Sequence, residues 1–213
     1  MASVPADAII QSDGLMAQAF PIQDMGSVTE ATIGNDLAAV SDSFAFDFEN
    51  AGCLRGRKIY TAKITEAEEA PITLGTILQR GVDKTYDIPD DELVKWKYLK
   101  GAKRIPRVAA NGHAYTFSEG AVAFPDPWDR PSRTMLTSEG TRSRSSHVVE
   151  GPETRRLRLL TPIETERLQG FEDGWTRTGM PERMRYFCMG NALVVPMVTR
   201  MGRVLDTIIA EEN

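Results

Sequence analysis

Four arginines and one threonine in the middle of this 213-residue chain have side chains that could bind a nucleic acid. Arginine can hold O6 and N7 of guanine with two hydrogen bonds or clamp a phosphate, and threonine can bond to bases or phosphates. The surrounding segment, Lys95 to Leu160, holds 13 Lys or Arg residues against six Asp or Glu residues. A solvated surface, with salt-bridge partners such as Asp129 and Glu139, would have the same composition. The candidate residues are Arg130, Arg133, Thr137, Arg142 and Arg144.

Gly190, Asn191 and Ala192 form a second candidate site, just before the last predicted helix. A Gly-Asn pair at a helix N-terminus presents backbone N–H groups and an amide side chain, which together suit a carboxylate. The alternative is an ordinary N-cap that binds no ligand.

Cys53 and Cys188 lack the paired spacing of a metal site or a disulfide framework. Two isolated cysteines of this kind are expected to be ordinary thiols. We therefore predict no catalytic residue and no metal site in this chain.

Period-two patterns predict strands in the first half of the chain. Phe44, Phe46 and Phe48 alternate with smaller or polar residues, which indicates a half-buried strand from Ser43. Lys58 to Ile64 alternates in the same way. Residues 113–137 are expected to form short strands between turns, and residues 138–146 a polar loop.

Helical patterns occupy the middle and the last third of the chain. Residues 74–79 and 89–100 are expected to be helices, the second with Trp96 in the core. Thr161-Pro162-Ile163-Glu164 is a capping box for a helix that ends at Gly170. Residues 181–188 predict a short helix, and residues 193–210 predict a long one with a continuous apolar stripe from Val194 to Ile208.

Two segments of the last third resemble signature motifs of the DNA cytosine-C5 methyltransferases. Arg158 to Asp173, RLLTPIETERLQGFED, is similar to the ninth motif, with Glu172 where a proline is common. Phe187 to Ala192, FCMGNA, is similar to the tenth. The Gly-rich cofactor loop, the Pro-Cys nucleophile and the Glu-Asn-Val acid that the family carries upstream are absent, and neither cysteine follows a proline.

The resemblance implies an α+β fold: a small mixed strand and helix target-recognition domain, followed by C-terminal helices that would pack on a Rossmann-like catalytic domain in a partner chain. It divides the chain into a leader (1–42), a DNA-binding target-recognition domain (43–157) and a helical segment with both motifs (158–213). Residues 130–140 resemble the segment that precedes the ninth motif, so residues 137–147 would form a DNA-facing loop.

The resemblance also implies a function and partners. The chain would be the target-recognition subunit of a heterodimeric DNA cytosine-C5 methyltransferase in a restriction-modification system, inactive alone. It would bind double-stranded DNA and complete a site for S-adenosylmethionine, shared with the partner and contacted here by Asn191 and Ala192. Two alternatives stay open: a stand-alone DNA-binding or regulatory protein derived from such an enzyme, and the C-terminal piece of a longer protein.

Charge and hydropathy agree with a DNA-binding part of the chain and indicate no membrane segment. The net charge is −5, but residues 1–50 alone contribute −8, so the remainder is basic. The longest apolar run, Leu193 to Val198, is too short for a membrane span, and the first residues do not resemble a secretory signal. We expect a cytoplasmic protein. The stripe from Val194 to Ile208 should be buried in a self-sufficient protein and partly exposed in a subunit.

Overall fold

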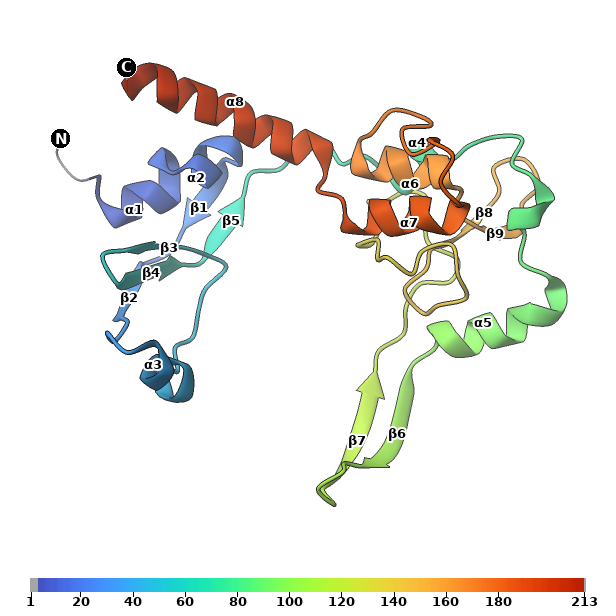
Figure 1. The fold of residues 1–213 in the computed structure, drawn as a ribbon, viewed down its shortest axis with the longest axis horizontal. Helices are drawn as coiled ribbons and strands as arrows, with labels where there is room; N and C mark the ends of the chain where they lie inside the picture. The colour runs from blue at the N-terminus through green and yellow to red at the C-terminus, as the bar shows by residue number, and fades with distance from the viewer. Residues whose placement is uncertain (1–3, 213) are drawn as a thin grey trace. The chain divides into compact units, whose positions relative to one another are not determined.

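The computed structural model describes residues 4–212 and divides them into two compact units. Unit 1 consists of the segments up to Ala70 and from Met197 onward, and unit 2 consists of residues 71–196. Unit 2 is therefore an insertion in the sequence of unit 1 (Figure 1). The expected boundaries after residues 42 and 157 fall inside the two units, and the ninth-motif helix belongs to the same unit as the segment before it.

Unit 1 contains two small antiparallel sheets with short helical segments around them. One sheet has the strand order β2-β4-β3, and the other pairs β1 with β5. The β3–β4 hairpin turns through Gly56 and Arg57, which both have positive φ values, as a tight two-residue turn requires. The elements of unit 1 are α1 (Ala6–Ala8), a π-helical turn (Ile9–Asp13), α2 (Leu15–Ala19), β1 (Ile22–Met25), β2 (Thr29–Thr32), α3 (Leu37–Ser43), β3 (Ala51–Arg55), β4 (Lys58–Ala62), β5 (Ile64–Glu66) and most of α8 (Val195–Glu212).

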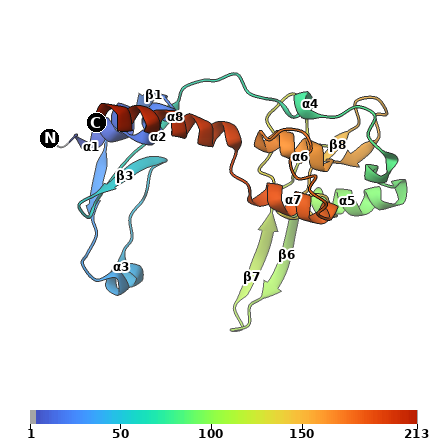
Figure 2. The same cartoon turned by 45° about the horizontal axis from the view of Figure 1, so that its top comes forward.

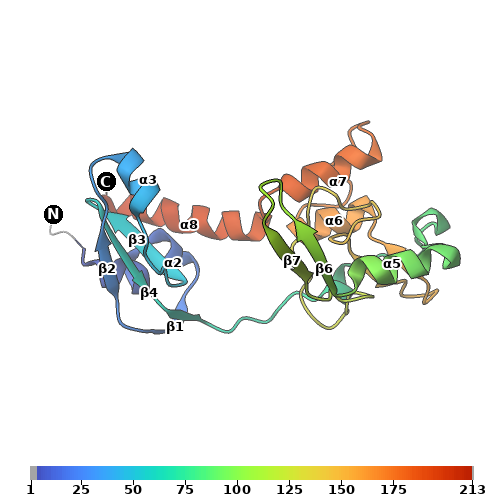
Figure 3. The same cartoon turned by 90° about the horizontal axis from the view of Figure 1, so that it is seen from below.

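Helix α8 lies beside α2 of unit 1 (Figure 3). Arg200 pairs with Glu69 at 2.7 Å and lies 5.3 Å from the centre of the Phe20 ring. The half-buried residues of the helix are Val195, Arg200, Met201, Val204 and Ile208. Val198 and Leu205, which belong to the same predicted stripe, are 42% and 46% exposed. The apolar stripe is thus split between a packed side and an open side.

The strand predicted from Ser43 is wrong. α3 extends to Ser43, and residues 44–50 form no strand. The rings of Phe44, Phe46 and Phe48 instead contact one another, with centroids 5.4 to 6.3 Å apart. The strand predicted over Lys58 to Ile64 is confirmed as β4 followed by β5, with a break at Lys63.

Unit 2 is built around β8 and β9. Successive strand residues point to opposite faces, so Val148 and Val149 of β8 enter different apolar clusters. Trp96, which is 2% exposed, lies in the cluster of Val148, as predicted. The elements of unit 2 are α4 (Leu74–Ile77), two 3₁₀ turns (Lys84–Tyr86 and Asp90–Glu92), α5 (Leu93–Lys100), β6 (Lys103–Val108), β7 (Ala114–Glu119), β8 (Val148–Glu150), β9 (Leu157–Leu159), α6 (Pro162–Gln169) and α7 (Glu182–Asn191).

Strands β6 and β7 form an antiparallel hairpin that extends away from the rest of unit 2 (Figure 2). The short strands expected between residues 113 and 137 are confirmed only for β7, because residues 120–137 form no strand. No helix between residues 4 and 212 is long and apolar enough to cross a membrane.

Candidate functional site

The ninth-motif segment forms α6, and its predicted capping box is present. Thr161 Oγ1 accepts the N–H of Glu164 at 3.2 Å, and the Glu164 carboxylate accepts the N–H of Thr161 at 2.8 Å. Gly170 ends the helix with a φ of 79°. These local features are those that the sequence predicted.

The Glu164 carboxylate also joins α6 to two other segments of unit 2. It is fully buried and accepts two hydrogen bonds from Arg158, at 2.6 and 2.8 Å, and one from the N–H of Gln79 at 2.7 Å. Arg158 is only 2% exposed, so the pair is shielded from water. Glu164 therefore anchors α6 to β9 and to the segment after α4.

The next residues of α6 fix the segment that follows it. Burial raises the pKa of Glu166, but hydrogen bonds from Arg185 and Thr176 outweigh burial and hold the pKa below its usual value. Arg167 binds Asp173 with two hydrogen bonds and lowers the pKa of that carboxyl. Arg167 also donates to the carbonyl of Ile77 at 2.9 Å. α6 is therefore an architectural element, as predicted.

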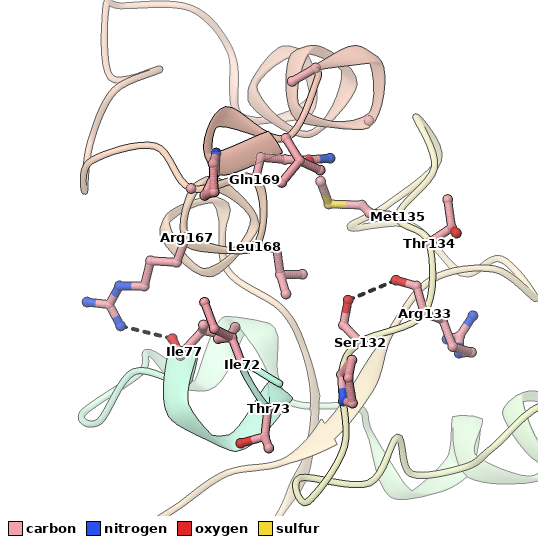
Figure 4. Close-up of a pocket in the computed structure, with 16 residues that line it drawn as sticks. Ile72, Thr73, Ile77, Ser132, Arg133, Thr134, Met135, Arg167, Leu168 and Gln169 are labelled. Atoms are coloured by element: carbon pink, nitrogen blue, oxygen red, sulfur yellow. Dashed lines mark hydrogen bonds between the residues drawn. The ribbon is translucent and has the colours of Figure 1, made fainter. Parts of the chain in front are cut away.

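A pocket of about 590 Å³ lies in unit 2 beside α6 (Figure 4). Arg167 to Gly170 form one wall, residues 131–135 another, and Ile72, Thr73 and Ile77 a third. Gly190, Ala192, Val194 and Pro196 complete the lining. The walls are mainly apolar. Two of these walls are held together by backbone hydrogen bonds. The N–H of Leu74 donates to the carbonyl of Arg130, and the N–H of Gly75 donates to the carbonyl of Trp128.

Two glycines allow the segments around the pocket to approach closely. A Cβ on Gly190 would lie 2.5 Å from the backbone nitrogen of Thr137 and 2.6 Å from the carbonyl carbon of Leu136. A Cβ on Gly170 would lie 2.4 Å from Cδ of Pro196. Gly190 thus brings the tenth-motif segment into direct contact with the segment after residue 135.

The helix N-terminus predicted at Gly190 and Asn191 is wrong. Gly190 and Asn191 are the last residues of α7, so they lie at a helix C-terminus and not at an N-terminus. Asn191 Nδ2 donates to the carbonyl of Phe187 at 3.0 Å, and Asn191 is exposed. Ala192 lines the pocket and Asn191 does not. The negative end of the helix dipole at Asn191 favours a cation over a carboxylate.

Arg133 and Arg144, two of the predicted nucleic-acid ligands, are engaged inside unit 2. Arg133 binds both oxygens of the buried Asp126, at 2.7 and 3.2 Å, and lines the pocket. Arg144 donates to the carbonyls of Leu99, Gly101 and Gly120, where the hairpin begins and ends. Both guanidinium groups hold the backbone in place.

Arg130, Thr137 and Arg142 are exposed. The side chain of Arg130 lies 3.7 Å from Asp129, whereas Arg142 pairs with Glu92 at 2.9 Å. The segment 137–147, which the sequence predicts to face DNA, is exposed at Thr137 and Arg142 but not throughout. Glu139 and His147 are buried and bond to each other at 2.9 Å, and Ser146 is also buried.

The sequence reasoning missed the exposed basic residues of the β6–β7 hairpin, Arg104 and Arg107. A signal was present, because the 26 residues from Leu93 to Ser118 contain six Lys or Arg residues and no Asp or Glu. The proline at position 106 obscured the strand, since proline is rare in strands other than edge strands. Both strands of an isolated hairpin are edges.

The structure offers no group of three or more metal-ligating side chains among residues 4–212. Cys53 and Cys188 are half-buried free thiols.

Comparisons with known proteins agree with the two motifs. Residues 15–207 match the family described as C-5 cytosine-specific DNA methylase. The chain is 44% identical over 218 aligned residues to the type II methyltransferase M.Sau3AI of Staphylococcus aureus, and the match covers 100% of this chain and 52% of that protein. The chain therefore spans about half the length, the carboxy-terminal half, of the curated relative.

Two solved structures are similar at low sequence identity. The Entamoeba histolytica methyltransferase EhMeth is 15% identical, with a TM-score of 0.42 over 93% of this chain and 56% of that chain. The Dnmt2 methyltransferase of S. pombe is 13% identical, with a TM-score of 0.46 over 86% of this chain and 57% of that chain.

Proposed function

Because this chain belongs to the C-5 cytosine-specific DNA methylase family, we propose that it is the target-recognition part of such an enzyme. In this proposal the chain binds duplex DNA and pairs with a catalytic half that carries the nucleophile and most of the cofactor site. The two halves form a heterodimer, and this chain alone transfers no methyl group.

The exposed basic surface of unit 2 carries the proposal. Lys95 and Lys97 on α5 and Arg104 and Arg107 on the hairpin are exposed, and no carboxylate occurs between residues 93 and 118. Such a surface attracts the phosphates of duplex DNA and releases their counterions. Arg130, Thr137 and Arg142 are exposed on the same unit and remain proposed DNA ligands.

The residues of the tenth motif fit one side of an S-adenosylmethionine site. Asn191 and Ala192 lie where α7 ends, and the negative end of the helix dipole there favours the α-ammonium group of the cofactor. Ala192 adds an apolar surface from the pocket wall. The pocket residues include no carboxylate for the ribose hydroxyls, so the catalytic half supplies the rest of the site.

The open side of α8 is the proposed contact with the catalytic half. Val198 and Leu205 lie two turns apart on the helix and are exposed in unit 1. Each of these side chains still exposes somewhat under half of its surface, so burying the rest on association would contribute roughly half of the about 1.5–3 kcal/mol for a whole side chain.

The test is reconstitution with the amino-terminal half of the Staphylococcus aureus relative, the part that this chain does not match. Labelled methyl transfer from S-adenosylmethionine to duplex DNA is measured for each half and for the mixture. We expect activity only in the mixture. Methyl transfer by this chain alone would refute the proposal. Duplex binding without any pairing or methyl transfer would favour the stand-alone DNA-binding alternative.

Charged substitutions on α8 test the contact. Val198→Glu combined with Leu205→Glu should abolish pairing in analytical ultracentrifugation and methyl transfer in the mixture, because both charges would be buried in the interface. Thr199→Glu with Thr207→Glu is the matched control, because it adds the same charge to exposed polar positions of the helix. Equal pairing by both double variants would show that the halves meet elsewhere.

A further inference from the structure

The two faces of the β6–β7 hairpin differ in chemistry. Directly paired residues of an antiparallel hairpin point to the same face, so the register assigns every side chain to one of two sets. One set, the even face, contains Arg104, Pro106, Val108, Ala114, Thr116 and Ser118. The other set, the odd face, contains Lys103, Ile105, Arg107, Tyr115, Phe117 and Glu119.

The odd face is largely satisfied by contacts within unit 2. Lys103 pairs with Glu119 at 3.3 Å and lies 5.1 Å from the centre of the Tyr98 ring. The guanidinium of Arg107 lies 4.0 Å from the centre of the Phe117 ring. These contacts stiffen the ribbon.

The even face is exposed at all six positions. It holds one guanidinium, two hydroxyls and small apolar groups, and it has no carboxylate. The side chains of Arg104 and Ser118 lie directly opposite each other, and Thr116 is the diagonal neighbour of Arg104. None of these three side chains has a hydrogen-bond or ion-pair partner within residues 4–212, so their polar groups remain available.

The base of the hairpin is held rigidly. Arg144 bonds to the carbonyls of Gly101 and Gly120 on the two sides of the hairpin, and Lys103 donates to the carbonyl of Leu99 at 3.2 Å. A ribbon fixed in this way presents its even face with little loss of conformational entropy on binding.

We propose that the even face of this hairpin enters the major groove of duplex DNA and that Arg104 reads a guanine, flanked by the Thr116 and Ser118 hydroxyls. This proposal rests on the proposed function and identifies the surface that distinguishes one DNA sequence from another. A two-stranded ribbon fits the major groove, which is about 12 Å wide, and each six-residue strand spans about 20 Å along it. Arginine holds O6 and N7 of guanine with two hydrogen bonds, while a hydroxyl can bond to either a donor or an acceptor group on a base.

Arg107 has a different role in this arrangement. It lies on the odd face, against Phe117, and points away from the groove floor when the even face enters. Together with the exposed Lys97 of α5 it contacts phosphates, which contributes affinity without sequence discrimination.

The experiment selects preferred sequences from a pool of duplexes with a randomised centre, using this chain alone and its mixture with the catalytic half. Arg104→Ala should lower affinity for the preferred duplex about 5- to 140-fold and remove the preference at one G·C pair. Arg104→Lys keeps the charge but not the bidentate fork, so it should lose the same preference. Arg107→Ala should weaken binding to all duplexes alike and reduce the salt slope by ~1.

Arg183→Ala, an exposed arginine of α7, is the matched control and should change neither preference nor affinity. Selection of the wild-type motif by Arg104→Ala would overturn the hairpin assignment and leave the recognition function standing. If the wild-type chain prefers no duplex, alone or in the mixture, the recognition function itself fails. Unchanged far-ultraviolet circular dichroism verifies that the variants remain folded.

Discussion

Replacing Glu164 with alanine should destabilise unit 2 severely. The carboxylate is fully buried and accepts four hydrogen bonds, two from Arg158 and two from backbone N–H groups. Its removal leaves a guanidinium that is 2% exposed without its counter-charge. Breaking a buried pair in this way costs about 3–5 kcal/mol. That loss is comparable to the whole stability of a small domain, about 5–15 kcal/mol.

Tryptophan fluorescence isolates this effect. The three tryptophans, Trp96, Trp128 and Trp175, all belong to unit 2. Urea unfolding followed by their emission therefore reports on unit 2 without a contribution from unit 1. We expect the midpoint of Glu164→Ala to fall far below that of the wild type.

Two matched variants separate the causes. Thr161→Ala removes the capping hydroxyl but leaves the ion pair, and should cost only about 1 kcal/mol. Arg158→Met with Glu164→Leu replaces both charges by apolar groups of similar size, and should recover much of the loss. If Glu164→Ala were no more destabilising than Thr161→Ala, the buried pair would have no structural importance and the reasoning would be refuted.

Two further outcomes are expected. Gly190→Ala should lower the thermal midpoint, because its Cβ would meet the backbone of residues 136 and 137, and overpacking costs about 1–3 kcal/mol. Gly202→Ala in α8, where the added Cβ meets open space, should raise the stability by up to about 1 kcal/mol. Circular dichroism melts that rank the two variants in the opposite order would contradict this difference in packing. Burial, reinforced by the Arg133 cation, lowers the pKa of Lys100 from 10.5 to about 8. Between pH 8 and 10 the unfolded state therefore binds more protons than the folded state. The free energy of unfolding should rise over this range by up to about 1.4 kcal/mol per pH unit. Above pH 10 the raised pKa of Tyr86, about 12, lowers the stability as pH increases. Lys100→Met should flatten the rise between pH 8 and 10 in urea titrations. A rise that persists in this variant would assign the effect to another group.

Local signals were the ones that the sequence predicted correctly. The capping box of α6 needs only Thr161 and Glu164, three residues apart, and it is present in the structure. Trp96, which the sequence predicted to lie in the core, is 2% exposed. The capping-box interaction lies within the predicted element, whereas Trp96 is buried against a cluster that includes Val148.

Features that depend on contacts between residues far apart in the sequence were not predicted correctly. Phe44, Phe46 and Phe48 have the alternation of a strand, but no other strand pairs with them and their rings pack together. The close approach of Gly190 to residues 136 and 137 is likewise a contact that no local pattern reveals. For the same reason the sequence could not distinguish the structural Arg144 from the exposed Arg104, because the carbonyls that bind Arg144 come from residues 99, 101 and 120.

The insertion of unit 2 into unit 1 sets the order in which the chain can mature on a ribosome. The segment of unit 1 that ends at Ala70 is synthesised before residues 71–196. The α8 segment of unit 1, which begins at Met197, is synthesised after them. At about 5–20 residues per second, synthesis of residues 71–196 takes roughly 6–25 s. During that interval the surface around Phe20 that later meets Arg200 is uncovered. Unit 2 can complete its fold first, so the recognition part is finished before the part that carries the proposed assembly surface.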